Sequence, residues 1–213
     1  MVDGIQSPSA PNGLLVVVSG PSAVGKDTVL EALLSAPIAN IPLEKCVTAT
    51  TRIPRVTNGE KTEQDGVDYH FINAARFNEM VANDEFLEYA EVHDHWYGTP
   101  RQWVVDRCSH GIDVILKIDV QGGLTVKQKE PGAVLIFLKP PSLEELDRRL
   151  RARGSETDDQ IALRLLNARK ELAQSPNYDY AVTNDTVAET VEVIRAILTA
   201  EHSRIKRITA PQI

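Results

Sequence analysis

One segment near the N-terminus constrains the fold more than any other. Residues Leu14–Ser19 form a continuous aliphatic run, which is typical of a strand buried on both faces. A short glycine-containing loop follows, and an apolar helical pattern opens at Thr28. This order of strand, tight loop and helix points backbone N–H groups at an anion, typically a phosphate. The loop residues are Gly20, Pro21, Ser22, Ala23, Val24, Gly25 and Lys26.

The spacing of the glycines and the lysine is that of a phosphate-binding loop (P-loop), in which Lys26 would reach the β and γ phosphates of a triphosphate. The strict pattern has Ser or Thr next as a Mg²⁺ ligand, whereas this sequence has Asp27 and then Thr28. Asp27 would either face Mg²⁺ or turn away, and we expect Thr28 to supply the hydroxyl contact. A chance turn before a solvated helix is the alternative, which both flanking elements argue against.

Two further apolar runs, Ile112–Ile118 and Ala133–Leu138, resemble the first, and a polar segment compatible with a helix follows each. This alternation predicts an α/β fold, with a parallel sheet covered by helices on its faces. The remaining expected elements are helices over 74–83, 143–153, 158–174 and 187–205 and a short strand over 180–183.

Composition narrows the class of protein. The chain has 213 residues and a net charge of −7, from 23 basic and 30 acidic residues, so we expect no nucleic-acid partner. No apolar run approaches the roughly 20 residues that span a bilayer, and residues 1–12 lack a signal pattern and predict a flexible tail. Cys46 and Cys108 fit no disulfide framework, which favours the cytoplasm. His93 and His95 have no third ligand in evident spacing, so we expect no protein-bound metal.

The stretch 47–100 is polar and has the character of an insertion between core elements. Arg52 and Arg55 lie around a proline with hydroxyls just upstream, a pattern that can clamp one phosphate from two sides. Tyr69 and Tyr97 are either phenol donors to that phosphate or half-buried core residues, and the sequence leaves both alternatives open.

Arginines cluster around the turn at Gly154. They are either a solvated helix face or part of a mobile lid that stabilises charge on a transferring phosphoryl group. Asp119, at the end of the run Ile112–Ile118, is likewise either a nucleotide or Mg²⁺ contact at the edge of the sheet or the N-cap of the next helix. The clustered arginines are Arg148, Arg149, Arg151, Arg153 and Arg164.

Several short motifs occur together along the chain. They are Ser19-Gly20-Pro21-Ser22 with Gly25-Lys26, Thr50-Thr51-Arg52 through Pro54-Arg55, Asp68-Tyr69, Tyr97-Gly98-Thr99, Ile118-Asp119-Val120-Gln121-Gly122, and Arg149 with Arg153-Gly154. With them, the chain from about Leu14 to the last helix resembles guanylate kinases. The resemblance implies a P-loop NTPase-type core with a parallel five-stranded sheet and helices on both faces, an inserted GMP-binding domain and a lid. It also implies ATP and GMP as substrates, with Mg²⁺ accompanying ATP.

The resemblance implies a role for each matching residue. It makes Lys26, Arg149, Arg153 and Arg164 catalytic, and it places ATP on the loop from Gly20 to Thr28, with Asn184 near the adenine. It assigns the GMP site to Thr48, Arg52, Arg55, Tyr69, Glu88, Tyr97, Thr99 and Asp119. Three features depart from the family. In the P-loop, Ala23 stands where Gly is common and Asp27 where Ser or Gly is common. Lys117 stands where an acidic residue is common, and the segment 56–68 is longer, so the register of Glu60 is open.

The expected division of the chain is a tail at 1–12, core segments at 13–46, 101–147 and 166–213, the GMP-binding insertion at 47–100 and the lid at 148–165. Two other functions compete with a guanylate kinase. One is a catalytically silent interaction module of the same fold, which retention of Lys26 and the arginines argues against. The other is a P-loop kinase for a different phosphate acceptor, against which the pattern of Glu88 with Thr48 and Thr99 argues. The sequence does not predict an oligomeric state.

Overall fold

The computed structural model describes residues 13–35, 38, 41–57, 60–92, 94–152, 154 and 157–204. Its strands are β1 (Leu15–Ser19), β2 (Leu43–Lys45), β3 (Ala49–Thr50), β4 (Val56–Thr57), β5 (Glu60–Lys61), β6 (His70–Phe71), β7 (Phe86–Val92), β8 (His95–Pro100), β9 (Asp113–Lys117), β10 (Val134–Lys139) and β11 (Tyr180–Thr183). Its helices are α1 (Lys26–Ser35), α2 (Ala74–Ala82), α3 (Arg101–Ser109), α4 (Val120–Lys129), α5 (Leu143–Ala152), α6 (Asp158–Leu172), a 3₁₀ turn η1 (Ser175–Asn177) and α7 (Val187–His202). None of the helices in these ranges is long and apolar enough to cross a membrane.

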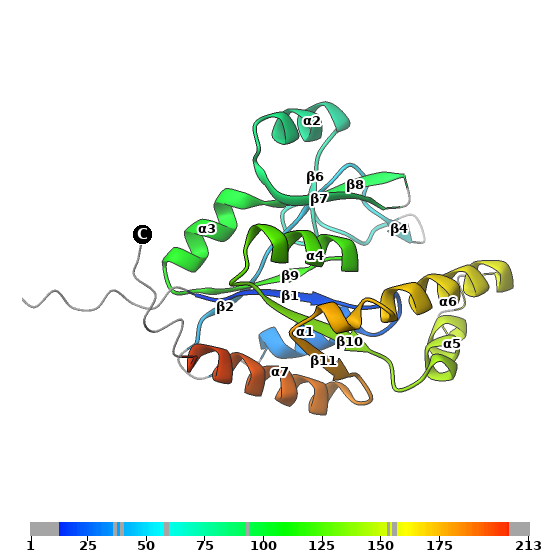
Figure 1. Ribbon diagram of the computed structural model, residues 1–213. Coiled ribbons are helices and arrows are strands. Elements are labelled where there is room, and N and C mark those ends of the chain that lie inside the picture. The colour runs from blue at the N-terminus through cyan, green and yellow to red at the C-terminus, as the bar shows by residue number, and fades with distance from the viewer. Residues whose placement is uncertain are drawn as a thin grey trace, which may run out of the picture.

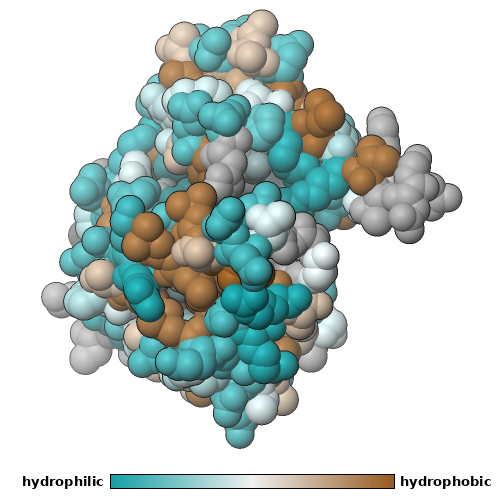
Figure 2. All heavy atoms as spheres, turned by 90° about the vertical axis from the view of Figure 1, so that its right-hand side faces the viewer, coloured by the Kyte–Doolittle hydropathy of each residue, from teal (hydrophilic) through white to brown (hydrophobic). Residues whose placement is uncertain are grey.

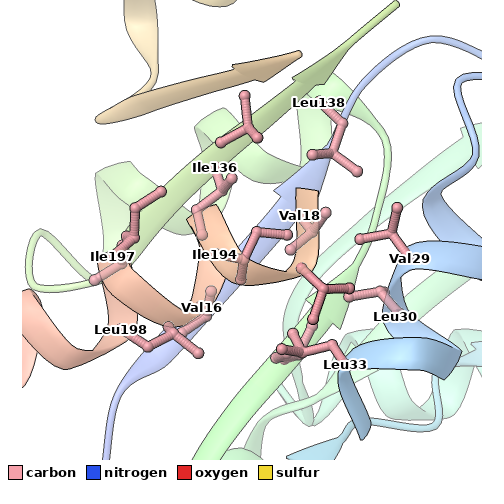
Figure 3. Packing of buried hydrophobic residues seen from close by; sticks show 14 of the residues in the cluster. Val16, Val18, Val29, Leu30, Leu33, Ile136, Leu138, Ile194, Ile197 and Leu198 are labelled. Carbon is pink, nitrogen blue, oxygen red and sulfur yellow. The ribbon is translucent and has the colours of Figure 1, made fainter. Parts of the chain in front are cut away.

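The main sheet is parallel, with strand order β11-β10-β1-β9-β2, so the predicted five-stranded core is confirmed. Helices α1 and α7 cover one face and α3 and α4 the other (Figure 1). The β1 side chains alternate between them: Val16 and Val18 pack against α1 and α7 (Figure 3). Val17 packs against α3 and α4. Burial on both faces explains why β1 is apolar throughout, and it fixes the position of the loop that follows.

Elements from the stretch 47–100 form a second sheet, with order β6-β3-β8-β7, which lies above the main sheet in Figure 1. Helix α2 covers it through a small core of Ala49, Phe77 and Phe86. Strands β7 and β8 are antiparallel, and Glu88 lies opposite Thr99 in their register. This pairing places two predicted site residues side by side.

Helices α5 and α6 pack on each other through a separate core of Leu146, Leu150, Ile161 and Ala168. The hydroxyl of Ser142 accepts the backbone N–H of Glu145 at the start of α5. Figure 2 shows the end of the molecule where these two helices lie, with hydrophobic residues gathered in the middle of that face.

The helix ends differ slightly from prediction. Helix α6 stops at Leu172 rather than 174, and α7 stops at His202, beyond which Ile205 lies outside the described residues. The predicted tail, 1–12, also lies outside them. Strand β2 was not located from the sequence.

Candidate active site

The loop between β1 and α1 turns sharply at the C-terminal edge of the main sheet. Three of its residues have positive φ angles: Gly20 at 147°, Ala23 at 63° and Gly25 at 97°. A left-handed conformation costs a residue with a Cβ about 1 kcal/mol or more. Ala23 packs against the core between α5 and α6, and this contact offsets part of the cost.

Lys26, the first residue of α1, folds back over this loop. Its ammonium group donates to the carbonyl oxygens of Gly20 at 2.5 Å and Pro21 at 3.0 Å. Burial lowers the pKa of Lys26 to about 8, so the side chain remains mostly charged at neutral pH. A charged donor at the N-terminus of a helix is suited to holding phosphate oxygens.

Asn184, which follows β11, supports the loop from below. It is buried, its amide donates to the carbonyl oxygen of Val24 at 2.7 Å, and it accepts a bond from the Thr190 hydroxyl at 2.9 Å. A Cβ at Gly25 would lie only 2.6 Å from the same amide. Both ends of the Asn184 side chain are therefore used inside the protein, and its adenine contact stays a prediction.

Two of the predicted lid arginines reach the loop. Arg149 on α5 donates to the carbonyl oxygens of Asn184 at 3.2 Å and of Val24 at 3.4 Å. Arg164 on α6 donates to the hydroxyl of Ser22 at 2.8 Å. The structure thus brings Arg149 and Arg164 together at the loop, although they lie on different helices.

The other arginines of the cluster divide differently. Arg148 pairs with Glu145 and Arg151 with Asp147. Their side chains are 70% and 53% exposed, so these two arginines belong to a solvated helix face, one of the two alternatives that the sequence left open. Arg153 lies outside the described residues, so its role stays a prediction.

In the insertion, Arg52 is held by a carboxylate of its own chain. Its two terminal nitrogens bond the Glu63 oxygens at 2.8 and 2.7 Å. The Glu63 carboxylate raises the pKa of Arg52. Glu63 also accepts a hydrogen bond from the backbone N–H of Arg55 at 2.8 Å. Glu63 is thus bound at the point where the two predicted phosphate-clamping arginines meet.

The two tyrosines lie beside this clamp. The guanidinium of Arg52 lies 5.4 Å from the ring centre of Tyr69, and the Tyr69 and Tyr97 rings meet edge to face at 5.8 Å. Both rings are half-buried, which is compatible with either of the two alternatives for them. The side chain of Arg55 is 73% exposed and extends towards solvent.

Glu88 is the buried carboxylate of the site. Only 3% of it is exposed, and the hydroxyl of Thr99 donates to it at 2.6 Å. Burial raises the pKa of Glu88 to about 7, against the bond from Thr99, which lowers it. Glu88 therefore faces inward and does not occupy the solvent side of an alternating strand. Thr48 is also buried, at 8% exposed.

Asp119 is the N-cap of α4. Its Oδ1 accepts the backbone N–H groups of Gln121 at 2.8 Å and Gly122 at 3.0 Å. The capping alternative for Asp119 is therefore present. A contact with the acceptor nucleotide stays a prediction.

Two charged contacts were not foreseen from the sequence. Glu63 is one of four carboxylates between residues 60 and 68, and nothing in their spacing selects it as the partner of Arg52. The second contact joins Asp27 to Lys117, 90 positions apart, at 2.5 Å. Burial raises the pKa of Asp27, but the bond to Lys117 and the charges of Lys117, Lys26 and Lys45 together outweigh it, so the pKa is lowered. Asp27 is thus turned towards β9. Thr28 is exposed.

A parallel five-stranded sheet, a P-loop after its central strand and two arginines that contact that loop from α5 and α6 define a P-loop nucleotide-binding protein of the kinase type. The family model for guanylate kinase matches residues 12–201. A guanylate kinase of Lactobacillus acidophilus is 46% identical, covering 93% of this chain and 94% of the relative. One of Caldanaerobacter subterraneus is 45% identical, covering 92% and 91%.

Comparison with solved structures gives the same result. The crystal structure of guanylate kinase from Anaplasma phagocytophilum superimposes with a TM-score of 0.75 at 33% identity, covering 93% of this chain and 90% of that one. The chain belongs to the guanylate kinase family.

Proposed function

We propose that this protein transfers the γ-phosphoryl group of ATP to GMP, giving ADP and GDP. The observation that carries the proposal is the convergence of Lys26, Arg149 and Arg164 on one loop, because a silent interaction module of this fold has no need for three cations there. Family membership supports the same reaction.

The reaction needs no general base. The second pKa of a phosphate monoester is about 6, so the GMP phosphate is already a nucleophile at neutral pH. What the protein supplies is in-line positioning and positive charge around the transferring group. Lys26 and the loop N–H groups would hold the donor phosphates, Arg149 and Arg164 would act on the γ-phosphate, and Arg52 and Arg55 would clamp the acceptor phosphate. Tyr69 and Tyr97 would donate phenol hydroxyls to it.

Glu88 would select the base. Guanine presents N1–H and the N2 amine side by side, which are two donors that one carboxylate accepts together. Adenine presents an acceptor at N1 and no N2 amine, so AMP would leave the buried carboxylate unpaired. Two hydroxyls would complete the contacts to the base, from Thr48 and from Thr99.

The loop also fits Mg²⁺. Hard oxygen ligands are present at its edge in Thr28 and Asp119, whereas Asp27 is paired with Lys117. Within the described ranges no three metal-ligating side chains gather into a cage. Mg²⁺ is usually bound through substrate phosphates and one or two carboxylates, so this set of ligands suits an ion that arrives with ATP. When bound, it would neutralise charge on the β and γ phosphates.

Two parts of the chain would move to close the site, the insertion 47–100 with GMP and the lid 148–165 with ATP. Bound between them, the nucleotides would be shielded from water, which suppresses hydrolysis of ATP. We propose a cytoplasmic location, in keeping with the free thiols of Cys46 and Cys108.

The test is a coupled assay of ADP release with GMP, AMP, UMP and CMP as acceptors. We expect turnover with GMP and at least about a hundredfold lower kcat/KM with AMP, because the unpaired charge is costly. Absence of turnover with every acceptor would return the chain to the interaction-module function. Preference for another nucleotide would overturn the acceptor assignment alone.

A further inference from the structure

The ion pair between Lys117 and Asp27 lies at the edge of the sheet where the proposed substrates meet. Lys117 is the last residue of β9, which pairs with β1 so that Lys117 lies opposite Val18, two residues before the P-loop. Asp27 is in the first turn of α1. The pair therefore joins the strand edge to the start of the phosphate-binding helix.

The two members of this pair differ in exposure. The side chain of Lys117 is 23% exposed, whereas that of Asp27 is 68% exposed. An ion pair with one partner in water stabilises a protein by about 1 kcal/mol or less, which does not offset the cost of enclosing a lysine. The stability of the folded protein therefore does not explain why a lysine occupies this position.

Lys117 also has unused hydrogen-bonding capacity. An ammonium has three N–H donors. In the part of the chain that the structure describes, the Nζ of Lys117 donates to one acceptor, Asp27 Oδ1. Lys127 provides a contrast, because its ammonium bonds the Ala133 carbonyl as well as the Asp179 carboxylate. Two donors of Lys117 remain for a ligand.

Lys117 interacts electrostatically with residues of both proposed phosphate sites. Its charge acts on Lys26 of the donor loop, and it is itself influenced by Tyr69 and Arg55 of the acceptor clamp. Burial would lower the pKa of Lys117, but the interactions with Tyr69 and Asp27 outweigh it and raise the pKa, so the group is charged at neutral pH. Lys117 is thus a charged group whose field acts on the donor loop and that is influenced by the acceptor clamp.

We propose that Lys117 is a catalytic residue that contacts the transferring phosphoryl group, and that Asp27 holds its ammonium in place until the nucleotides bind. This inference rests on the proposed function, and the resemblance does not imply it, because the family commonly has an acidic residue at this position. In the reaction, the bond from the γ-phosphorus to the β–γ bridging oxygen breaks and leaves its electron pair on ADP. An oxygen of the GMP phosphate forms the new bond to phosphorus. Lys117 donates to the equatorial oxygens and transfers no proton.

The test compares Lys117→Met with Lys127→Met, which also removes a lysine from an ion pair but lies away from the site. We expect kcat of Lys117→Met to fall more than tenfold and typically about a hundredfold, as for loss of one charged donor to a transition state. KM for each nucleotide should change less than about threefold. Lys117→Arg should recover part of the lost kcat, and Lys127→Met should match the wild type. If Lys117→Met does not fold, as judged by circular dichroism, Lys117→Gln takes its place.

A binding measurement separates catalysis from structure. An adenosine–guanosine pentaphosphate spans both sites, whereas ADP and GMP occupy one each. Calorimetry should show that Lys117→Met weakens the pentaphosphate at least tenfold and ADP or GMP much less. The inference is overturned if kcat falls less than tenfold, or if Lys117→Met and Asp27→Asn lose equal activity and equal thermal stability, as two halves of a purely structural pair would. Inactivity of the wild type with GMP would instead refute the proposed function.

Discussion

Replacing Glu88 by Gln tests the proposed choice of base most directly, because the change keeps the shape of the side chain and removes its charge. The Gln amide has one oxygen and one NH₂ group, so it can accept only one of the two guanine donors and sets a donor against the other. Loss of one hydrogen bond to a charged group costs about 1.5–3 kcal/mol, which corresponds to about a 12- to 160-fold fall in kcat/KM for GMP.

The structure places this cost at the upper end of the range. Glu88 is buried, and a Cβ at Gly122 would lie 2.9 Å from its Oε2, so there is no space for the side chain to move away from an unfavourable contact. The bond from Thr99 to Oε1 fixes the other oxygen. The Gln amide can meanwhile donate to N1 of adenine, so kcat/KM for AMP should rise as that for GMP falls.

The assay is ADP release with GMP and with AMP, run on the wild type, Glu88→Gln and Glu91→Gln. Glu91 lies on the same strand but is exposed, so its variant should behave as the wild type. The reasoning is refuted if Glu88→Gln keeps the full preference for GMP over AMP. In that case another group recognises guanine.

The other predictions concern phosphate charge and stability. Lys26→Met should lower kcat by about a hundredfold or more while circular dichroism stays unchanged, and near-normal turnover would remove the P-loop assignment. Arg164→Ala should lower kcat more than it raises KM for GMP, whereas Arg148→Ala should change neither, and equal behaviour of the two would return Arg164 to the solvated surface. The pKa of Glu88 is raised to about 7 in the folded state. The folded protein therefore holds a proton that the unfolded chain loses above pH 4.5, and stability falls as pH rises between these values. Denaturant unfolding should show Glu88→Gln equal to the wild type near pH 4.5 and more stable by about 3 kcal/mol at pH 8. An equal difference at both pH values would contradict the raised pKa of Glu88.

The parts of this molecule that follow from local patterns were predicted from the sequence. Strands β1, β9 and β10 are buried on both faces, so they appear as apolar runs without any knowledge of their neighbours. Strand β2 has the sequence Leu43-Glu44-Lys45 and only three residues, and it forms because it pairs with β9. Its formation depends on tertiary pairing, which leaves no local pattern to detect.

The same distinction applies to the site. Lys26 could be predicted because strand, loop and helix are contiguous, and Glu88 because the resemblance to guanylate kinases implies it. The pair of Lys117 with Asp27 joins positions that only the parallel pairing of β1 and β9 brings together. Each of these two residues, taken alone, was a departure from the expected pattern. In the folded chain Asp27 and Lys117 are each other's ion-pair partners, so the two departures from the family pattern form one structural feature.

Three cations of the two proposed phosphate sites are hydrogen-bonded to groups of the protein itself. Lys26 donates to loop carbonyls, Arg52 to Glu63 and Arg164 to Ser22. Phosphate binding therefore exchanges hydrogen bonds rather than adding them. The net gain in binding free energy per contact is the difference between the bond to a phosphate and the bond to the internal partner. That difference is small for Arg52, whose partner is a bidentate carboxylate, and larger for Lys26, whose partners are neutral carbonyls. In the proposed reaction, the donor loop is thus suited to hold its phosphates firmly, and the acceptor clamp to release GDP and take up GMP rapidly.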